Sequence, residues 1–330
     1  MNDFKQKPID DVDLINIIMM TRGRPEKLKR ALASLDDAAV MKDKIHLWAY
    51  VDDDDPPTLD LINSGWDKSI GFQVNWHIGS RPITHGAAFT EIWHVSSNAA
   101  LYMGFNDDYV INTPDWDLAV RETFRNVPDD RIAIGSISDP LMPEDDLNFP
   151  VFTAEWINQV GHVIIPYFPY WFGDTWAQQI AEMVDRKYKI PVSVWPMDGE
   201  KGKTHRLWDL PFWTRFFHFL LAERVITAKQ IIEELTEDNS IERDQAINLM
   251  YRKMEEFENK AQNEPSKDQQ LAHQLTFTAE GNKKNASYLI ALDQAQAHLN
   301  LMKPLVMEIN TQRILRQKKS LLAQSLFGLK

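Results

Sequence analysis

The chain has 330 residues, a formal net charge of −12 and no cysteine. Its length suits one large domain with an appendage, and 44% apolar with 25% charged residues is an ordinary globular composition. The negative charge argues against binding to nucleic acid or anionic lipid, which both depend on a basic surface. The lack of cysteine excludes disulfides, thiolate zinc sites and cysteine nucleophiles, and it fits a reducing compartment.

No segment is typical of a targeting signal or a membrane span. The first residues, MNDFKQKPIDDVD, are polar and acidic, unlike a signal peptide. The most apolar early run, Leu14–Met20, is too short to cross a bilayer. We therefore expect a soluble, cytoplasmic protein.

The first part of the chain alternates strand-like and helix-like segments. Leu14–Met20 is a continuous apolar run, as in a strand buried on both faces. A helix is predicted from Pro25 onward, because apolar residues then recur at positions 28, 31, 32 and 35. Ile45–Val51 is a second strand, and the sequence DDDDPP ends it.

The same alternation continues further along. Residues 72–76 predict a third strand, about 87–99 a helix, 100–105 a fourth strand and Arg131–Ile137 a fifth. Strand, helix and strand in this order predict βαβ units. We therefore expect an α/β fold with a mainly parallel sheet and helices on both faces.

The last third of the chain has a different character. It is compatible with long helices and shows two apolar seams at helical spacing, Ile247–Met250–Met254–Phe257 and Leu292–Ala295–Leu299–Met302. We expect a first domain over residues 1–219 and a helical extension over 220–330. The extension either mediates homo-oligomerisation or partner docking, or it packs on the first domain of the same chain.

Polar residues follow each of the first four predicted strands. They are Thr21, Arg22 and Arg24, then Asp52 to Asp55, then Arg81 and His85, and finally Asn106, Asp107 and Asp108. Because ligands of open α/β sheets bind beyond the carboxyl ends of the strands, these residues are predicted to meet at one edge. Arg81 and His85 are candidates for phosphate contacts.

Asp107 and Asp108 form the sharpest signal in the sequence. Two like charges about 4 Å apart cost roughly 4 kcal/mol at an effective dielectric near 20, so a cation between them is favoured. Carboxylate oxygens suit Mg²⁺ or Mn²⁺, which also bind phosphate oxygens. A solvated turn is the alternative, since Asp is common after strands. The buried strand before the pair and the TPDWD turn after it favour the metal site.

The segments IIMMTRGRPEKLKRAL, AYVDDDD and GFNDDYVINTPDWD together resemble the family-2-type glycosyltransferases of the GT-A fold, over roughly residues 14–215. The resemblance implies a GT-A fold and a hexosyltransferase-type enzyme that uses Mn²⁺ or Mg²⁺. Its donor would be a nucleotide-diphosphate sugar of UDP or GDP type, and its acceptor a hydroxyl group.

The resemblance also implies roles for single residues. Thr21 and Arg22 would line the nucleotide pocket, and Asp52 or Asp53 would contact the base or ribose. Asp107 and Asp108 would face the metal and the diphosphate. The first acid of the usual motif is replaced here by Phe105 or Asn106. It therefore stays open which acid binds the metal directly and whether Asn106 contributes.

Asp174 lies in the aromatic-rich segment YFPYWFGDTW. From the residues alone it could be the N-cap of a helix, and the surrounding Tyr167, Tyr170, Trp171 and Trp176 could stack on sugars or build a core. The resemblance implies that Asp174 is the catalytic base of an inverting transfer, which needs a carboxylate to take the proton of the acceptor hydroxyl.

The basic segment KGKTHR at residues 201–206 is either an exposed loop or part of the site. The resemblance implies that a histidine on such a late loop, here His205, reaches the metal or the diphosphate. Imidazole is a suitable ligand for Mn²⁺, and basic side chains would offset charge on the leaving group.

Other functions compete with this reading. A sugar-nucleotide pyrophosphorylase needs a glycine-rich loop after the first strand, where the chain has only Gly23. The GxGxxG of Rossmann dehydrogenases and the P-loop are both absent from that turn. The rival from another class is a catalytically silent binding or structural module that assembles through the helical tail.

Overall fold

The computed structural model describes residues 13–82, 84–168, 171–198, 214, 217–218 and 220–263. The chain divides into two units, one of residues 1–204 and 227–250 and one of residues 205–226 and 251–330. The sheet and the described site residues belong to the first unit, whereas His205 belongs to the second.

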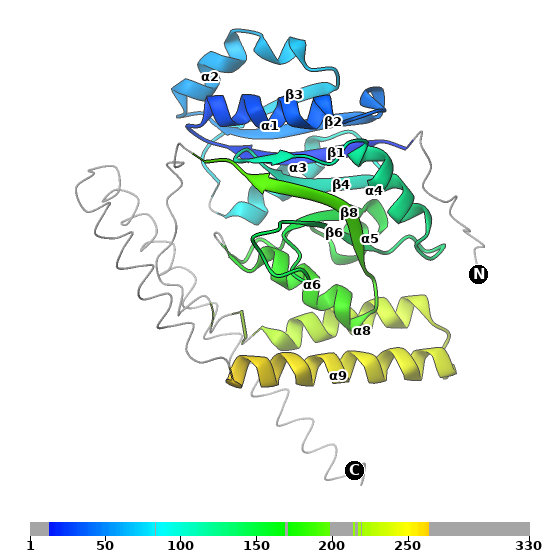
Figure 1. Ribbon diagram of the computed structural model, residues 1–330. Coiled ribbons are helices and arrows are strands. Elements are labelled where there is room, and N and C mark those ends of the chain that lie inside the picture. The colour runs from blue at the N-terminus through cyan, green and yellow to red at the C-terminus, as the bar shows by residue number, and fades with distance from the viewer. Residues whose placement is uncertain are drawn as a thin grey trace. The chain divides into compact units, whose positions relative to one another are not determined.

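The first unit is built on a sheet of eight strands. Their order across the sheet is β3 (Gln73–Gly79), β2 (Ile45–Asp52), β1 (Ile15–Thr21), β4 (Leu101–Asn106), β7 (Phe149–Thr153), β6 (Ile134–Ser138), β8 (Lys187–Pro196) and β5 (Tyr109–Ile111) (Figure 1). The strands from β3 to β4 are parallel, as are β6 and β8, whereas β7 and β5 run antiparallel to their neighbours. The predicted α/β class with a mainly parallel sheet is confirmed.

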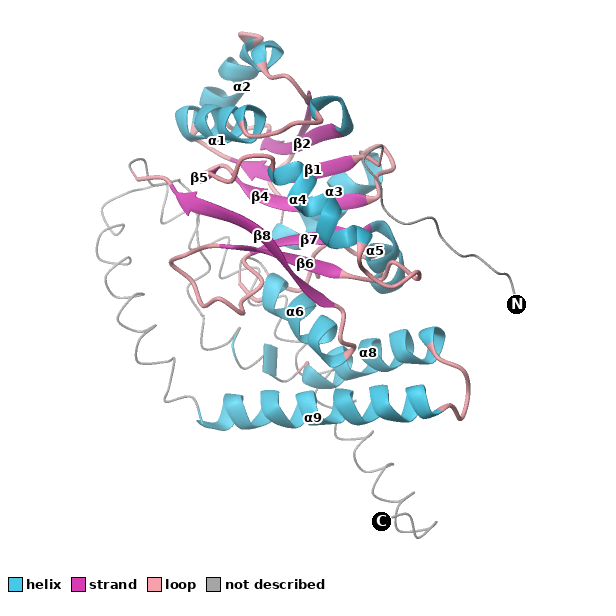
Figure 2. Ribbon diagram, turned by 45° about the vertical axis from the view of Figure 1, so that its right-hand side comes forward, coloured by secondary structure: helices cyan, strands magenta, loops and turns pink. Residues whose placement is uncertain are grey.

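Helices lie on both faces of this sheet, as the sequence predicted. Helices α1 (Pro25–Asp37) and α4 (Trp116–Arg125) bury their apolar side chains in one core with β1, β2, β4 and β8. Helix α3 (His85–Val95) covers the opposite face, where a Cβ atom added to Gly104 of β4 would lie 3.5 Å from the Phe89 ring. Figure 2 shows the strands in magenta and the helices that flank them.

The described residues also form the helical elements η1 (Lys42–Lys44), α2 (Pro56–Asn63), η2 (Trp66–Ser69), α5 (Ala154–Val160), α6 (Gly173–Met183), α8 (Leu221–Leu235) and α9 (Ile241–Asn263). Helix α9 contains the first predicted seam, residues 247–257, whereas the second seam lies outside the described residues. Within the described ranges, no helix combines the length and the apolar character needed to cross a membrane.

Two boundaries differ from the sequence-based prediction. Helix α3 begins earlier, because Thr84 is its N-cap and accepts a hydrogen bond from the Ala87 amide, and it ends at Val95, since Ser96 is extended. The fifth predicted strand begins at Ile134 and not at Arg131, because Arg131 has a left-handed backbone with φ 58° that a strand does not accommodate. Strands β5, β7 and β8 were not predicted.

Candidate functional site

The ends of β1 and β4 lie next to each other at the carboxyl edge of the sheet. The parallel register pairs Met20 with Asn106, so the following residues, Thr21 and Asp107, are also neighbours. Thr21 Oγ1 donates a hydrogen bond of 2.8 Å to Asp107 Oδ2, and both side chains are buried. Asn106, the last residue of β4, is exposed.

Arg24 spans both acids of the pair. It lies directly before α1, and Pro25 starts the helix behind it. Its Nε donates to Asp107 Oδ2 at 3.1 Å, its Nη2 forms an ion pair with Asp107 Oδ1, and its Nη1 donates to Asp108 Oδ2 at 2.7 Å. The guanidinium group therefore supplies positive charge between Asp107 and Asp108, where the sequence predicted a metal ion.

The two acids differ in their access to solvent. The Asp107 side chain is fully buried, whereas that of Asp108 is 33% exposed. Burial raises the pKa of Asp107 to about 6, although the charge of Arg24 and the Thr21 hydrogen bond act in the opposite direction. Asp107 is thus an enclosed group that holds Thr21 and Arg24 in place, and Asp108 is the acid that faces outward.

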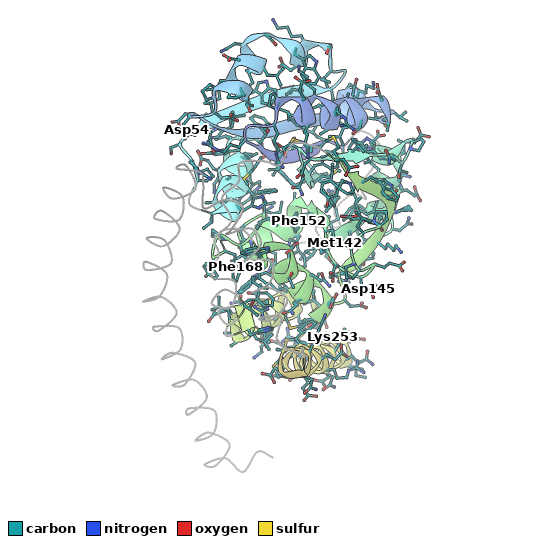
Figure 3. All side chains as sticks on the ribbon, turned by 60° about the vertical axis from the view of Figure 1, so that its left-hand side comes forward. Asp54, Met142, Asp145, Phe152, Phe168 and Lys253 are labelled. Carbon is teal, nitrogen blue, oxygen red and sulfur yellow. The ribbon has the colours of Figure 1, made fainter. Side chains whose placement is uncertain are left out.

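A second ion-pair cluster lies at the end of β2. Arg22 Nη1 donates to Asp52 Oδ2 at 2.7 Å, and Nη2 donates to Asp54 Oδ2 at 3.1 Å. Hydrogen bonding to Asp54 raises the pKa of Arg22 and in turn lowers the pKa of Asp54, whereas burial raises the pKa of Asp52 despite its bond to Arg22. Asp54 is exposed and lies at the periphery of the molecule in Figure 3.

The other two acids of the DDDD sequence have different surroundings. Asp55 is buried and accepts hydrogen bonds from the Gly23 amide, at 2.8 Å, and from Thr58 Oγ1, so it fastens the turn after β1 to helix α2. Asp53 is exposed, and its amide donates to the Gly79 carbonyl at 2.8 Å. Of the two acids predicted at the base or ribose, Asp53 has its side chain at the surface and Asp52 is held by Arg22.

Arg81 differs from the other two arginines of this edge. It is partly buried and makes no hydrogen bond or ion pair within the part of the chain that the structure describes. The pKa of Arg81 is lowered, mainly by burial and also by the charge of Arg22, although the charges of Asp52 and Asp54 act in the opposite direction. Arg81 therefore lies within the electrostatic influence of the Arg22 cluster and still has its donors available.

His85 does not supply a positive charge at this edge at neutral pH. Its ring lies 4.9 Å from that of Phe89 within α3, and burial lowers its pKa to about 4. A neutral imidazole can still donate or accept a hydrogen bond.

Asp174 lies in the first turn of α6 and is not its N-cap, because that position belongs to Phe172. The alternative that Asp174 serves as the helix cap is therefore wrong. The carboxylate accepts hydrogen bonds from the amide and Oγ1 of Thr175, at 2.7 and 3.2 Å, and its side chain is only partly exposed. Burial raises the pKa of Asp174, although the hydrogen bonds from Thr175 act in the opposite direction, and a raised pKa makes a carboxylate a stronger base.

Helices α3 and α6 begin against the same short segment. A Cβ atom on Gly86 would lie 2.4 Å from the Ile165 carbonyl oxygen, and one on Gly173 would lie 2.6 Å from Ile164 Cγ2. Residues 164–165 therefore connect the start of α3, which follows Arg81, to the turn of α6 that carries Asp174.

The aromatic residues around Asp174 mostly pack on one another. Trp176 is buried, and the rings of Tyr167 and Phe168 lie 5.8 and 6.1 Å from its ring. Trp176 is therefore a core residue and not a platform for a sugar, whereas Trp171 is partly exposed. Tyr170 lies outside the described residues, as do His205 and the whole basic segment 201–206.

The side chains at the edge fit a divalent ion that is shared with a ligand. Among the described residues, no three His, Cys, Asp or Glu side chains gather as a metal cage. Asp107 is enclosed by its partners, but Asp108 is partly exposed and its Oδ1 makes no hydrogen bond to the described residues. Mg²⁺ is commonly held by one or two carboxylates together with phosphate oxygens and water, which is the arrangement that Asp108 allows.

The pairing of Arg24 with both acids was missed at the sequence level, although Arg24 was a candidate for the site. The register of β1 and β4 is the signal that could have found it. Two apolar parallel strands that end at Thr21 and Asn106 bring the residues of the two following turns together.

No protein-family model matches the chain, and no curated protein sequence matches it. Several solved structures are similar in the course of their chains. The mannosyltransferase PcManGT from Pyrobaculum calidifontis, in complex with GDP-Man and Mn²⁺, has a TM-score of 0.47 and 10% identity, over 88% of this chain and 90% of that chain.

Two further structures show similar values. TarS residues 1–349 of S. aureus has a TM-score of 0.49 and 11% identity, over 90% of this chain and 87% of that chain. GalNAc-T7 with UDP, GalNAc and Mn²⁺ has a TM-score of 0.49 and 10% identity, over 78% of this chain and 59% of that chain.

Proposed function

We propose that the protein is a metal-dependent glycosyltransferase that moves a sugar from a nucleotide-diphosphate donor of UDP or GDP type to an acceptor hydroxyl. One observation carries the proposal. Arginines and acids from the ends of β1, β2 and β4 form interlocked ion pairs at the carboxyl edge of the sheet, through Arg22 and Arg24. This is the edge at which open α/β sheets bind nucleotides.

The charges at this edge favour a cation as a cofactor. Six acids, Asp52 to Asp55 with Asp107 and Asp108, face three arginines, Arg22, Arg24 and Arg81. An anionic diphosphate would meet a surplus of negative charge there, and only Arg81 among the three arginines is without an ion-pair partner in the described chain. A divalent cation together with Arg81 would make the edge attractive to a diphosphate.

In this proposal Asp108 would hold Mn²⁺ or Mg²⁺ together with the diphosphate of the donor. The ion, when bound, offsets the charge that develops on the diphosphate as the sugar leaves. Thr21 and Asp107 keep Arg24 in position, Arg22 and Asp52 form the side of the site toward the nucleoside, and Arg81 contacts phosphate oxygens. Asn106 is exposed beside the acids and is a further candidate for the donor site.

Asp174 is the proposed base of an inverting transfer. Its carboxylate would take the proton from the acceptor hydroxyl while that oxygen attacks the anomeric carbon. The first-turn position in α6 and the raised pKa support this role. His205 would be a further ligand of the ion or the diphosphate.

The competing function is a catalytically silent module, and a specific observation favours it. Arg24 forms ion pairs with both acids at once, which offsets their mutual repulsion without any metal ion. Such a module would bind neither UDP nor GDP in a metal-dependent way, and its helical tail would serve assembly.

The decisive experiment measures UDP and GDP binding by isothermal titration calorimetry, with Mn²⁺ and with EDTA, and slow donor hydrolysis in the presence of UDP- and GDP-sugars. We expect binding to depend on Mn²⁺. Asp108→Ala should weaken metal-dependent binding at least tenfold, because it removes the accessible carboxylate. Asp174→Ala should leave donor binding within about twofold and lower transfer by two orders of magnitude or more.

Asp145→Ala is the matched control, since it removes an exposed carboxylate from a loop after β6 (Figure 3). It should change neither binding nor transfer. A wild-type protein that binds no nucleotide diphosphate with Mn²⁺ present would favour the silent module. A normal transfer rate in Asp174→Ala would show that another group is the base.

A further inference from the structure

We propose that Arg24 is a built-in counter-ion that weakens the binding of a free divalent cation and makes that binding depend on an anionic ligand. The inference rests on the proposed function for the identity of the anion, a nucleotide diphosphate. It concerns a property of the chain that the proposed function does not require, since a metal-dependent transferase needs no competing internal cation.

The first step of the argument is the geometry of Arg24. All three of its guanidinium nitrogens bind the acid pair, with Nε and Nη2 on Asp107 and Nη1 on Asp108. Its side chain is only 14% exposed, so solvent screens these contacts weakly. One side of the planar guanidinium group is bound by Asp107, whose carboxylate is fully buried.

The second step is the difference between the two acids. Asp107 cannot leave Arg24 without becoming an unpaired buried charge, because Thr21 is its other hydrogen-bond partner among the described residues and carries no charge. Asp108 is partly exposed and shares a single hydrogen bond with Nη1. Arg24 therefore stays bound to Asp107, and the hydrogen bond from its Nη1 to Asp108 is the contact that a metal ion can replace.

The third step is electrostatic. A divalent ion on Asp108 would lie close to the guanidinium group of Arg24, and the two positive charges would repel each other. A diphosphate relieves this repulsion, because its oxygens bind the ion and accept from Nη1. The ion and the diphosphate are then positively coupled, and each raises the affinity of the other by the same factor.

The test measures Mn²⁺ binding without any nucleotide, by electron paramagnetic resonance of the free ion. The variants are R24Q, R125Q and the double variant R24Q/D108N. R125Q removes the same charge from an exposed arginine of α4 that forms an ion pair with Glu122, away from the proposed site. R24Q should bind Mn²⁺ at least tenfold more tightly than wild type, R125Q should stay within about threefold, and the double variant should lose the gain.

Equal Mn²⁺ affinity in R24Q and wild type would overturn the proposal. An equal gain in R125Q would also overturn it, because the gain would then come from the lower positive charge of the protein as a whole. A gain that persists in R24Q/D108N would place the ion elsewhere and would refute the exchange at Asp108.

A second variant covers the case in which R24Q does not fold, which circular dichroism would reveal. R24K keeps the charge near Asp107, but a single ammonium group does not span both acids, so Asp108 is left accessible. R24K should bind Mn²⁺ about threefold or more tighter than wild type, and an unchanged affinity in a folded R24K would refute the proposal.

The coupling is tested separately with UDP and GDP as probes. Saturating nucleotide should raise the Mn²⁺ affinity of the wild type, and the ratio of the two affinities should fall at least tenfold in R24Q. If the wild type binds neither nucleotide, the proposed function fails. The nucleotide-free comparison would still decide the role of Arg24.

Discussion

Asp107 is a carboxylate without solvent contact, and its position depends on two partners from the turn after β1. Asp107→Ala would leave the Arg24 guanidinium with one of its two acids and Thr21 without its acceptor. Breaking a buried ion pair from one side costs about 3–5 kcal/mol. We expect a loss of that size in the free energy of unfolding, measured by urea titration.

Two variants calibrate this prediction. Thr21→Val removes only the neutral donor and should cost about 1–2 kcal/mol. Asp54→Ala removes an exposed partner of Arg22 and should change stability by less than about 1 kcal/mol. An Asp107→Ala variant as stable as Asp54→Ala would show that the buried pair contributes nothing to the folded state.

His85 and His162 give the stability of the protein a dependence on pH. Burial lowers the pKa of each to about 4, from 6.5. Because the unfolded chain binds these protons first, the stability is complete above pH 6.5 and is lost as the pH falls from about 6.5 toward 4. Each histidine should account for up to about 3 kcal/mol over this range.

The measurement is urea unfolding at several pH values between 7 and 4.5. His85→Gln and His162→Gln should each flatten the pH dependence, and the double variant should flatten it most. His46→Gln is the comparison, since it removes a partly exposed histidine from β2. A slope in the double variant that equals the wild-type slope would assign the acid sensitivity to other groups.

At the scale of the element, the start of α3 can pack against residues 164–165 only because Gly86 has no side chain. A methyl group at residue 86 would collide with the carbonyl oxygens of Ile165 and Ile164, which are backbone atoms and cannot turn aside. Gly86→Ala should therefore push α3 away from residues 164–165 and cost about 1–3 kcal/mol. We also expect Gly86→Ala to weaken nucleotide binding, because α3 follows Arg81 in the chain and a shift of α3 would displace that arginine.

Gly104→Ala is the matched control for this element. Its added Cβ would meet the Phe89 and Pro150 rings at ordinary contact distances of 3.5 Å. We expect a change of about 1 kcal/mol or less in the free energy of unfolding. If both alanine variants melt alike, the contact of α3 with residues 164–165 does not constrain the fold.

The strands at the centre of the sheet could be predicted because they are buried on both faces. Ile15, Ile17 and Ile18 have no exposed surface, and such a run has few alternatives to a parallel strand. Their ends then follow from polar stops, which placed Thr21, Asp52 and Asp107 at one edge. The helix from Pro25 was equally clear, since its predicted apolar face is the one that packs in the core.

The other half of the sheet was less predictable because its strands break the usual signals. Strand β8 contains Pro191 and Pro196, and its pairing with β6 shifts register between Ile137 and Ser138. Proline within a sheet occurs at such irregularities, but in the sequence alone it argues against a strand. Strand β7 contains Pro150. The Arg24 ion pairs depend on side-chain rotamers, which no periodicity reports.

At the scale of the whole molecule, we propose that residues 220–330 form a helical extension of the domain over 1–219 and that it mediates self-association. Helix α9 keeps large apolar side chains at its surface, with Tyr251 47% and Ile241 71% exposed. Tyr251 follows Ile247 and precedes Met254 at helical spacing, so it lies beside the predicted seam.

Light scattering of the full chain tests this proposal. We expect a mass about twice that of the 38.3 kDa chain at high concentration, and a shift toward the monomer in Tyr251→Asp, because a charge in an apolar interface is costly. Arg252→Asp introduces the same acid on the next residue, outside the seam, and should stay associated. A wild-type chain that remains monomeric at all concentrations would leave the extension a packing or docking role.

The backbone of Phe172 has a further consequence. Its φ of 72° is one that a side chain of this size rarely adopts, at a cost of about 1–2 kcal/mol, and its ring lies 5.7 Å from that of Phe168. The backbone conformation of Phe172 sets the direction of helix α6, and therefore the orientation of the Asp174 carboxylate two residues later. Phe168→Ala would remove a ring that packs on Phe172, so the substitution should misplace the Asp174 carboxylate while leaving that acid intact.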